Sequence, residues 1–162
     1  MDKKLTFRRA DKNDIPRLLE ILSQVLEVHA KIRPDLFVPG TTKYSAQDLE
    51  PMVVDDQNPI YVAVNEEGVV AGYTFCQLQE PPFTSTMIPR KSLFIDDFCV
   101  DEVFRGQHVG EQLFEYVKQE AVRLGCYEVT LNVWAGNDGA ERFYERMGLT
   151  TKERMMELIL DK

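Results

Sequence analysis

One stretch of the sequence combines a tight glycine turn, an arginine and the start of a helix. Residues 104–114 read FRGQHVGEQLF, in which Gly106 and Gly110 allow the backbone to fold tightly. No Ser, Thr, Asp or Asn stands at the junction to cap the free N–H groups of the helix, and Gln107 would cap them poorly. Such N–H groups carry partial positive charge and Arg105 adds a fixed cation, so the stretch predicts an anion-binding site.

The anion is expected to be a phosphate, but two common nucleotide-binding patterns are absent from the chain. There is no GxGxxG after a predicted strand and no GxxxxGK[ST] anywhere. A dinucleotide site of the Rossmann type and a P-loop are therefore not expected. A phosphate-binding protein of some other kind stays open as one interpretation of the turn.

Two neighbouring acids interrupt the apolar stretch just before this turn. Asp96 and Asp97 lie within residues 92–100, SLFIDDFCV, which predicts a strand. Neighbours on a regular strand point to opposite faces, so the two acids form no pair unless a bulge intervenes. A carboxylate in a cleft can take the proton of an ammonium group, whose pKa is about 10.4. The alternatives are substrate anchoring and a buried, hydrogen-bonded carboxylate.

A tyrosine in a later predicted helix is a candidate proton donor. Tyr144 lies in residues 138–147, DGAERFYERM, and a phenol can give a proton to a departing group. Phe143 and Met147, four residues apart, already form an apolar face. Tyr144 lies about 100° around the helix from Phe143 and can face a different space. The alternative is that Tyr144 packs in the core.

Hydrophobic periodicity predicts the elements that position these residues. We expect strands at residues 5–10, 59–64, 68–78, 92–100, 127–133 and 150–160, and helices at 11–30, 46–56, 109–124 and 138–147. Asp11 or Asp14 can cap the first helix, and Asp138 and Glu141 are spaced as a capping box for the last one. This order predicts an α/β (α+β) chain with a mixed sheet and helices on its faces.

The turn and the last helix resemble two signatures of the GNAT family of N-acetyltransferases. The family turn, Arg/Gln-x-x-Gly-x-Gly/Ala, is similar to Arg105–Gly110, with His108 where the family usually has its first glycine. The strand at Ile95–Val100 resembles the hydrophobic and acidic pattern that precedes this turn. The second signature, Asn-x-x-Ala-x-x-Phe-Tyr-x-x-x-Gly-Leu, is matched at Asn137, Ala140, Phe143, Tyr144, Gly148 and Leu149.

The resemblance covers nearly the entire chain and implies a fold and a cosubstrate. It implies a single domain over residues 1–162, with a mixed, mostly antiparallel central sheet and helices on both faces. It implies acetyl-CoA, with pantetheine lying along the strand and pyrophosphate on the turn. The residues that would bind it are Phe98, Cys99, Val100, Arg105, Gly106, Gln107, His108, Val109, Gly110 and Asn137. The alternatives are that His108 points to solvent and that Asn137 is a turn residue or a helix cap.

The reaction implied by the resemblance is direct attack of a primary amine on the thioester, without a covalent enzyme intermediate. Asp96 falls where the family often places a glutamate base, and its shorter side chain favours a water relay; Tyr144 would be the general acid. Further candidates for the wall of the acceptor site are His29, Arg33, Phe37, Tyr44, Asp97 and Trp134. The competing function is a non-catalytic acyl-CoA-binding module that senses or regulates. The acceptor itself is left open among small-molecule and peptide amines.

Composition and charge narrow the remaining function classes. Hydrophobic residues make up 44% and charged residues 28%, as in an ordinary globular domain. A formal net charge of −8 without a basic cluster argues against nucleic-acid binding. The charge suits a cationic acceptor, although solubility is the simpler explanation.

The remaining sequence features predict a cytoplasmic protein without a metal. Three cysteines without a CxxC pair are expected to be reduced thiols, and no apolar run is long enough for a signal peptide or a membrane span. His29 and His108 lack acidic residues at metal-ligand spacing, so we expect no metal site. The apolar residues 154–160, RMMELIL, form a terminal segment that can pair across a homodimer.

Overall fold

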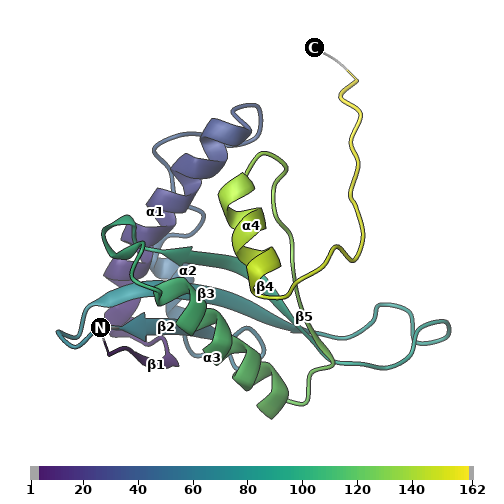
Figure 1. Ribbon diagram of the computed structural model, residues 1–162, viewed down its shortest axis with the longest axis horizontal. Helices are drawn as coiled ribbons and strands as arrows, with labels where there is room; N and C mark the ends of the chain where they lie inside the picture. Colours follow the sequence, from purple (N-terminus) through teal and green to yellow (C-terminus); the bar gives the residue numbers. More distant parts are fainter. Residues whose placement is uncertain (1–3, 161–162) are drawn as a thin grey trace.

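The computed structural model describes residues 4–160 as one sheet with helices packed on it (Figure 1). The elements in chain order are β1 (Thr6–Arg9), η1 (Lys12–Asp14), α1 (Ile15–Ile32), α2 (Ala46–Met52), β2 (Ile60–Val64), β3 (Val70–Gln79), β4 (Ser92–Val100), η2 (Glu102–Phe104), α3 (Val109–Arg123), β5 (Glu128–Leu131) and α4 (Asp138–Arg146). The strands lie side by side in sequence order. β1 to β4 pair antiparallel and β5 pairs parallel to β4, which confirms the predicted mixed, mostly antiparallel sheet.

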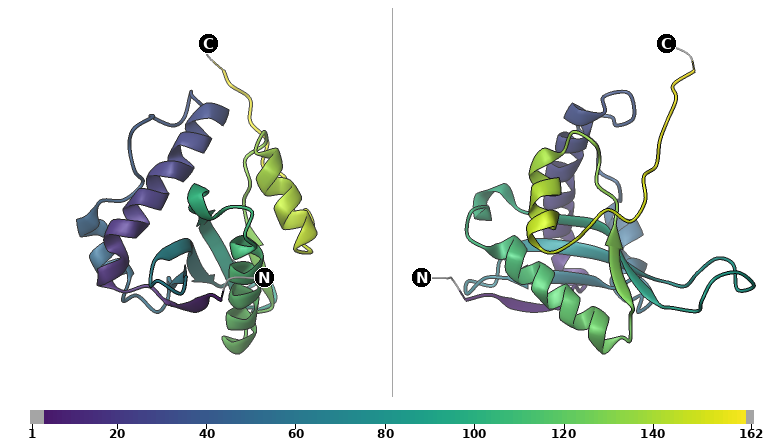
Figure 2. Two further views of the ribbon diagram at one scale, coloured as in Figure 1. Left: turned by 60° about the vertical axis from the view of Figure 1, so that its left-hand side comes forward. Right: turned by 45° about the vertical axis from the view of Figure 1, so that its right-hand side comes forward.

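Helices cover both faces of this sheet, as the pattern predicts (Figures 1 and 2). α1 packs Leu18 and Leu22 against one face together with α2, and α3 packs Leu113 and Val117 against the other face together with α4. β2 is buried along its whole length, because its alternate residues point to opposite faces and each face is covered by helices.

The helix boundaries follow from local capping. Asp11 caps η1 by accepting a hydrogen bond from the N–H of Asn13. Asp14 accepts a hydrogen bond from the N–H of Asp11, which completes a capping box, and α1 begins directly after it. α4 is capped by Asn137, which corrects the expected capping box of Asp138 and Glu141. The cap therefore lies one residue earlier than the expected position, at the asparagine of the second signature.

The strand expected at residues 150–160 is wrong. Residues 151–160 form an extended segment without regular secondary structure that leaves the body beyond α4 (Figure 1, yellow). A strand requires a backbone partner, and no backbone hydrogen bond joins residues 151–160 to the rest of the described chain. We call residues 151–160 the arm.

Candidate functional site

The site is organised by the point at which β4 and β5 separate. The two strands pair only where Ser92–Ile95 lies opposite Glu128–Leu131. β4 continues to Val100, and among residues 4–160 no strand pairs with this last part of its β5-facing edge. The backbone N–H and C=O groups of Phe98, which face that edge, are therefore available to an extended ligand.

The chain after β4 turns into α3 without a side-chain cap. The N-cap of α3 is His108, and its side chain makes no cap hydrogen bond, which confirms the missing cap. Two residues of this turn are left-handed, Gly106 with φ 77° and His108 with φ 61°. A residue with a Cβ rarely adopts this conformation, so His108 stores strain here. The backbone N–H groups at the start of α3 lack a side-chain acceptor and suit an anion.

The side chains of the turn are held by nearby acceptors. Nε of Arg105 donates to the carbonyl of Val100 over 3.3 Å, and Nε2 of Gln107 donates to the carbonyl of Val103 over 3.4 Å. Nδ1 of His108 lies 3.3 Å from a carboxylate oxygen of Glu111, and its side chain is 60% exposed. The imidazole of His108 thus lies at the surface rather than across the turn.

Gly110 allows α3, α4 and β4 to approach one another closely. A Cβ on Gly110 would lie 3.4 Å from the ring of Phe143 on α4 and 3.6 Å from Val100. A larger side chain at this position would push α4 away from the turn. Asn137 lies at the start of α4, and its Oδ1 accepts from the N–H of Ala140 over 3.4 Å. Asn137 is therefore a helix cap through its side-chain oxygen. Its amide nitrogen makes no hydrogen bond among the described residues.

A buried carboxylate ties this turn to α1, and the sequence analysis did not identify it. Asp101 is 4% exposed and accepts hydrogen bonds from Arg17 at 2.6 Å, Gln24 at 3.2 Å and the N–H of Val103 at 3.1 Å. Burial raises the pKa of Asp101, but the hydrogen bonds from Arg17, the N–H of Val103 and Gln24, together with the charge of Arg17, hold it below its ordinary value. Its only sequence signal is an acid at the end of an apolar strand.

A bulge in β4 brings the two neighbouring acids to one face. The register between β3 and β4 shifts, so that Phe75 lies opposite Asp97 while Cys76 lies opposite Ile95. Asp96 is the extra residue, and both carboxylates point to the side of the sheet that α1 and α2 cover. The structure thus contains a bulge, which the sequence analysis named as the condition for the two acids to share a face.

Asp97 has the properties of a proton acceptor near neutral pH. One carboxylate oxygen accepts a hydrogen bond from the hydroxyl of Tyr73 over 3.0 Å. Burial raises the pKa of Asp97 to about 6, against the opposing effects of the Tyr73 hydroxyl and the charge of Lys43. Asp96 nearby raises this pKa further. At pH 7 Asp97 is therefore mostly ionised and more basic than an exposed aspartate.

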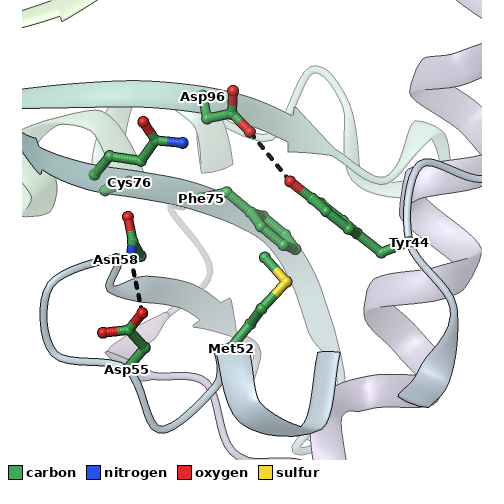
Figure 3. Close-up of a pocket in the computed structure, with 8 residues that line it drawn as sticks. Tyr44, Met52, Asp55, Asn58, Phe75, Cys76 and Asp96 are labelled. Atoms are coloured by element: carbon green, nitrogen blue, oxygen red, sulfur yellow. Dashed lines mark hydrogen bonds between the residues drawn. The ribbon is translucent and has the colours of Figure 1, made fainter. Parts of the chain in front are cut away.

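Asp96 is held in an ion pair that sequence patterns do not reveal. Nζ of Lys43 lies 2.7 Å from Oδ2 of Asp96. The hydroxyl of Tyr44 lies 3.5 Å from the same oxygen, as Figure 3 shows. Burial lowers the pKa of Lys43, but the hydrogen bond to Asp96 and the charges of Asp96, Tyr44 and Asp97 together raise it overall. Lys43 lies in the loop between α1 and α2, where no periodicity marks a functional lysine.

A shallow pocket opens beside Asp96 (Figure 3). Tyr44 forms one wall, because its ring stacks on Phe75 with centroids 5.7 Å apart and an interplanar angle of 8°. Opposite it, the amide of Asn58 donates to Asp55 over 2.8 Å. The complete lining consists of Tyr44, Met52, Asp55, Asn58, Phe75, Cys76, Gln77 and Asp96. The pocket therefore combines an aromatic wall with carboxylates, and both attract a cationic group.

Tyr144 lies on α4 in a cluster of aromatic rings beside β4. Its ring is 5.3 Å from Phe143, 6.2 Å from Phe98 and 6.4 Å from Phe114, measured between centroids. Burial raises the pKa of Tyr144 above its ordinary value, and the nearby Asp97 and Cys99 raise it further. The phenol is therefore protonated at neutral pH, and its ring also packs in the core.

The remaining acceptor-site candidates gather at the far end of α1. The rings of His29 and Phe37 are 5.3 Å apart, and Phe37 meets Trp134 edge-on at 5.5 Å. The guanidinium of Arg33 lies 5.8 Å from the centroid of Trp134. Burial lowers the pKa of His29, and the charge of Lys43 lowers it further, so its imidazole is neutral at pH 7. Residues from α1, its following loop and the segment after β5 thus form one aromatic wall.

The described residues hold no metal-ligand cluster: within residues 4–160, no three His, Cys, Asp or Glu side chains are placed to bind an ion. Cys76 and Cys99 are buried, and burial raises the pKa of each thiol to about 12. Cys126 is only partly buried, unlike the other two. Over the same part of the chain, every helix is too short or too polar to cross a membrane.

Known proteins share both the sequence pattern and the fold. The Acetyltransferase (GNAT) family matches residues 24–149. The chain belongs to this family. It is 32% identical over 84 residues to the glucosamine 6-phosphate N-acetyltransferase of Arabidopsis thaliana, covering 48% of this chain and 54% of the relative. It is 25% identical over 151 residues to the uncharacterized N-acetyltransferase MJ1207 of Methanocaldococcus jannaschii, covering 93% of this chain and 63% of the relative. The matches thus span about half the length of these GNAT relatives.

Solved structures share the fold of this chain. The BH1408 protein of Bacillus halodurans superposes with a TM-score of 0.90 at 29% identity, covering 96% of this chain and 99% of that one. The Arabidopsis thaliana glucosamine-6-phosphate N-acetyltransferase shares the fold with a TM-score of 0.69 at 22% identity, covering 98% and 100%. The resemblance to GNAT proteins and the predicted fold class are both confirmed.

Proposed function

We propose that this GNAT protein is an acetyl-CoA-dependent N-acetyltransferase that acts on a primary amine. The observation that supports this most directly is the free edge of β4, which leads into the uncapped start of α3. An extended amide chain such as pantetheine can pair with that edge, and a pyrophosphate suits the N–H groups of the turn. The residues fit the cosubstrate that the GNAT family uses.

Each part of the cosubstrate has a counterpart among the predicted residues. Of the predicted residues Phe98, Cys99 and Val100, the first and last direct backbone groups to the free strand edge, because the N–H and C=O of Cys99 face Tyr73 of β3. The backbone of the turn, with Arg105 beside it, faces the phosphates; its residues are Arg105, Gly106, Gln107, His108, Val109 and Gly110. The amide nitrogen of Asn137 is available as a further donor, because only its oxygen caps α4.

The acceptor amine binds, in this proposal, on the α1 side of β4. Asp96 takes the ammonium group in place of Lys43, and the wall of His29, Phe37 and Trp134 contacts the rest of the acceptor. Arg33 supports Trp134 and is itself occupied by acidic partners. A related protein is named for glucosamine 6-phosphate and another is an aminoglycoside acetyltransferase, so small-molecule amines are the first class to test, with peptide amines second.

Two groups move protons in this proposal. When bound, acetyl-CoA supplies an activated thioester carbonyl, so no covalent intermediate with the enzyme is required. Asp97 accepts the ammonium proton through a water molecule, because its pKa of about 6 suits a base at neutral pH. Asp96, the base expected from the resemblance, is better suited to bind the ammonium, since it already binds that of Lys43. Tyr144 holds its proton and donates it to the departing sulfur.

Thermal unfolding with and without acetyl-CoA tests the cosubstrate first. A ligand at a hundred times its Kd adds roughly 2.7 kcal/mol to the unfolding free energy. For a chain of this size the Tm should rise by about 5–10 °C, and NAD or ATP should change it little. An unchanged Tm at saturating acetyl-CoA would contradict the proposal.

Release of the CoA thiol in the presence of amines tests catalysis. Tyr144→Phe should keep the acetyl-CoA shift in Tm and lose roughly 10²-fold in kcat, because general acids contribute at that scale. Tyr127→Phe is the matched control, since Tyr127 is 64% exposed and remote from the cleft. A Tyr144→Phe variant that turns over like the wild type would contradict the acid role. Binding without thiol release for any amine would favour the sensor module instead.

A further inference from the structure

Lys43 holds a primary ammonium group at the acids of the β4 bulge. Its Nζ lies 2.7 Å from Oδ2 of Asp96 and 5.4 Å from the centroid of the Tyr44 ring. The side chain of Lys43 is 47% exposed, so its amine is accessible to a reagent. Of the lysines that form ion pairs within residues 4–160, Lys118 and Lys152 pair with acids outside β4. Among these lysines, Lys43 is the one that brings an amine to the proposed acceptor site.

The charge of Lys43 also acts on other residues of the acceptor site. Burial lowers the pKa of His29, and the charge of Lys43 lowers it further. Burial raises the pKa of Asp97 to about 6, while the Tyr73 hydroxyl and the charge of Lys43 oppose this rise. Charges act on one another most strongly at short range in a partly buried site. The ammonium group of Lys43 therefore lies within electrostatic reach of both the bulge acids and the aromatic wall.

The open edge of β4 directs the reactive end of the proposed cosubstrate toward the same place. The pairing of β4 with β5 ends at Ile95, and β4 continues to Val100. A ligand with its pyrophosphate on the turn after Val100 runs back along this edge, so its far end extends toward Asp96 and Asp97. Lys43 carries its amine on a flexible four-carbon stem. The amine and the thioester can therefore meet at the bulge, and such proximity accelerates attack.

We propose that Lys43 is a site of self-acetylation, at which the protein transfers an acetyl group from acetyl-CoA to its own side chain. This inference rests on the proposed function. The Lys43 nitrogen forms a bond to the acetyl carbonyl carbon, and the carbon–sulfur bond breaks. Of the three protons on that nitrogen, one passes through water to Asp97 and one stays on the amide. The third replaces the proton that Tyr144 donates to the sulfur. The net products are acetylated Lys43, the CoA thiol and one proton.

Incubation of the 162-residue chain with acetyl-CoA, without any amine, is the first test. We expect Lys43 to gain one acetyl group, measured by intact mass and peptide mapping, at a rate per chain that is independent of protein concentration. It should react roughly 10²-fold faster than Lys118, because a positioned acid or base contributes at that scale. Lys118 is the matched lysine, since its side chain is 49% exposed and also forms an ion pair.

Two arginine variants locate the reaction. Lys43→Arg keeps the positive charge beside Asp96 but has no primary amine, so the fast uptake of one acetyl group should disappear. Its Tm should still rise with acetyl-CoA. Lys118→Arg should take up the acetyl group as fast as the wild type. Fast uptake that persists in Lys43→Arg would overturn the assignment to Lys43.

A second measurement requires no acetyl-CoA. Acetylation replaces the ammonium group by a neutral amide, and Lys43→Gln has a neutral amide as well. Because the charge of Lys43 lowers the pKa of His29, this pKa should be higher in Lys43→Gln than in the wild type, as measured by NMR titration. Lys118→Gln should leave it unchanged. An unchanged His29 pKa in Lys43→Gln would mean that the ammonium group lies outside the acceptor site, and would overturn the proposal.

The remaining outcomes separate this inference from the proposed function. Equal rates at Lys43 and Lys118 would indicate uncatalysed acetylation, and a rate per chain that grows with protein concentration would indicate transfer between chains; either result would overturn self-acetylation. An unmodified Lys43 in a protein that acetylates an added amine would overturn this inference alone. An unchanged Tm at saturating acetyl-CoA would contradict the proposed function, and this inference with it.

Discussion

Replacing Asp97 with asparagine should make the protein more stable and much less active at neutral pH. Burial raises the pKa of Asp97 from 3.8 to about 6, so its charged form is disfavoured in the folded state. Two pKa units correspond to about 3 kcal/mol, and partial solvent access reduces this to about 1–3 kcal/mol. The amide oxygen of asparagine can still accept the Tyr73 hydroxyl, so that hydrogen bond need not be lost.

The direction of the stability change follows from the pH dependence of the unfolding free energy. Because the folded pKa lies above the unfolded one, folded Asp97 binds more protons between pH 4 and pH 6. The Asp97 contribution to stability is present below about pH 4 and is lost as the pH rises through about 6. The Asp97→Asn variant has no carboxyl group to ionise, so it does not lose this stability as the pH rises. Its Tm should exceed that of the wild type by about 2–10 °C at pH 7, and the difference should vanish near pH 4.

Activity should move in the opposite direction. The kcat/KM of the wild type should fall tenfold per pH unit below about pH 6, as Asp97 becomes protonated. Asp97→Asn should lose roughly 10²–10⁴-fold in kcat/KM at pH 7.5. Asp56→Asn is the control, since the Asp56 side chain is 89% exposed and its ion-pair partner is Arg9. A variant that is less stable than the wild type at pH 7, or equally active, would refute the reasoning.

Two further substitutions test the acceptor site and the turn. Lys43→Met should lower KM for a cationic amine by up to about fivefold with kcat unchanged. The reason is that the acceptor no longer displaces a half-exposed ion pair with Asp96, which is worth roughly 0.2–1 kcal/mol. Lys118→Met should change neither constant, and a higher KM for Lys43→Met would mean that Lys43 contacts the acceptor. His108→Gly should raise the Tm by about 1–4 °C, because glycine removes left-handed strain of roughly 1–2 kcal/mol and loses part of that gain in backbone entropy. Gln107→Gly in the same turn has no such strain to relieve and should lower the Tm; a fall for both variants in thermal melts would contradict this account.

The glycine turn before α3 could be predicted from the sequence because its determinants are local. Glycine at a left-handed position and the absence of a cap before Val109 depend on a few consecutive residues, and the structure has both. The order of β4, α3 and α4 was predicted from periodicity for the same reason. Family membership followed from these local patterns.

The position and ionisation of the two carboxylates on β4 depend on tertiary structure. A bulge depends on the pairing of β3 with β4, so only the register shows that Asp96 and Asp97 share a face. The pKa of Asp97 depends on what buries it, and the partner of Asp96 is Lys43, 53 residues away. No periodicity carries such contacts, because they are made across elements.

The arm also shows which features depend on the sequence and which depend on tertiary contacts. Its run of apolar residues predicted an extended segment, and large side chains at both odd and even positions give that segment two apolar faces. Whether that segment is a strand depends on a partner, since β-structure is completed by hydrogen bonds to another segment, whereas a helix completes its own. In this protein the sequence by itself determined the turn, the helices and the apolar arm, and the tertiary structure decided which charges meet and which strand edges are left open.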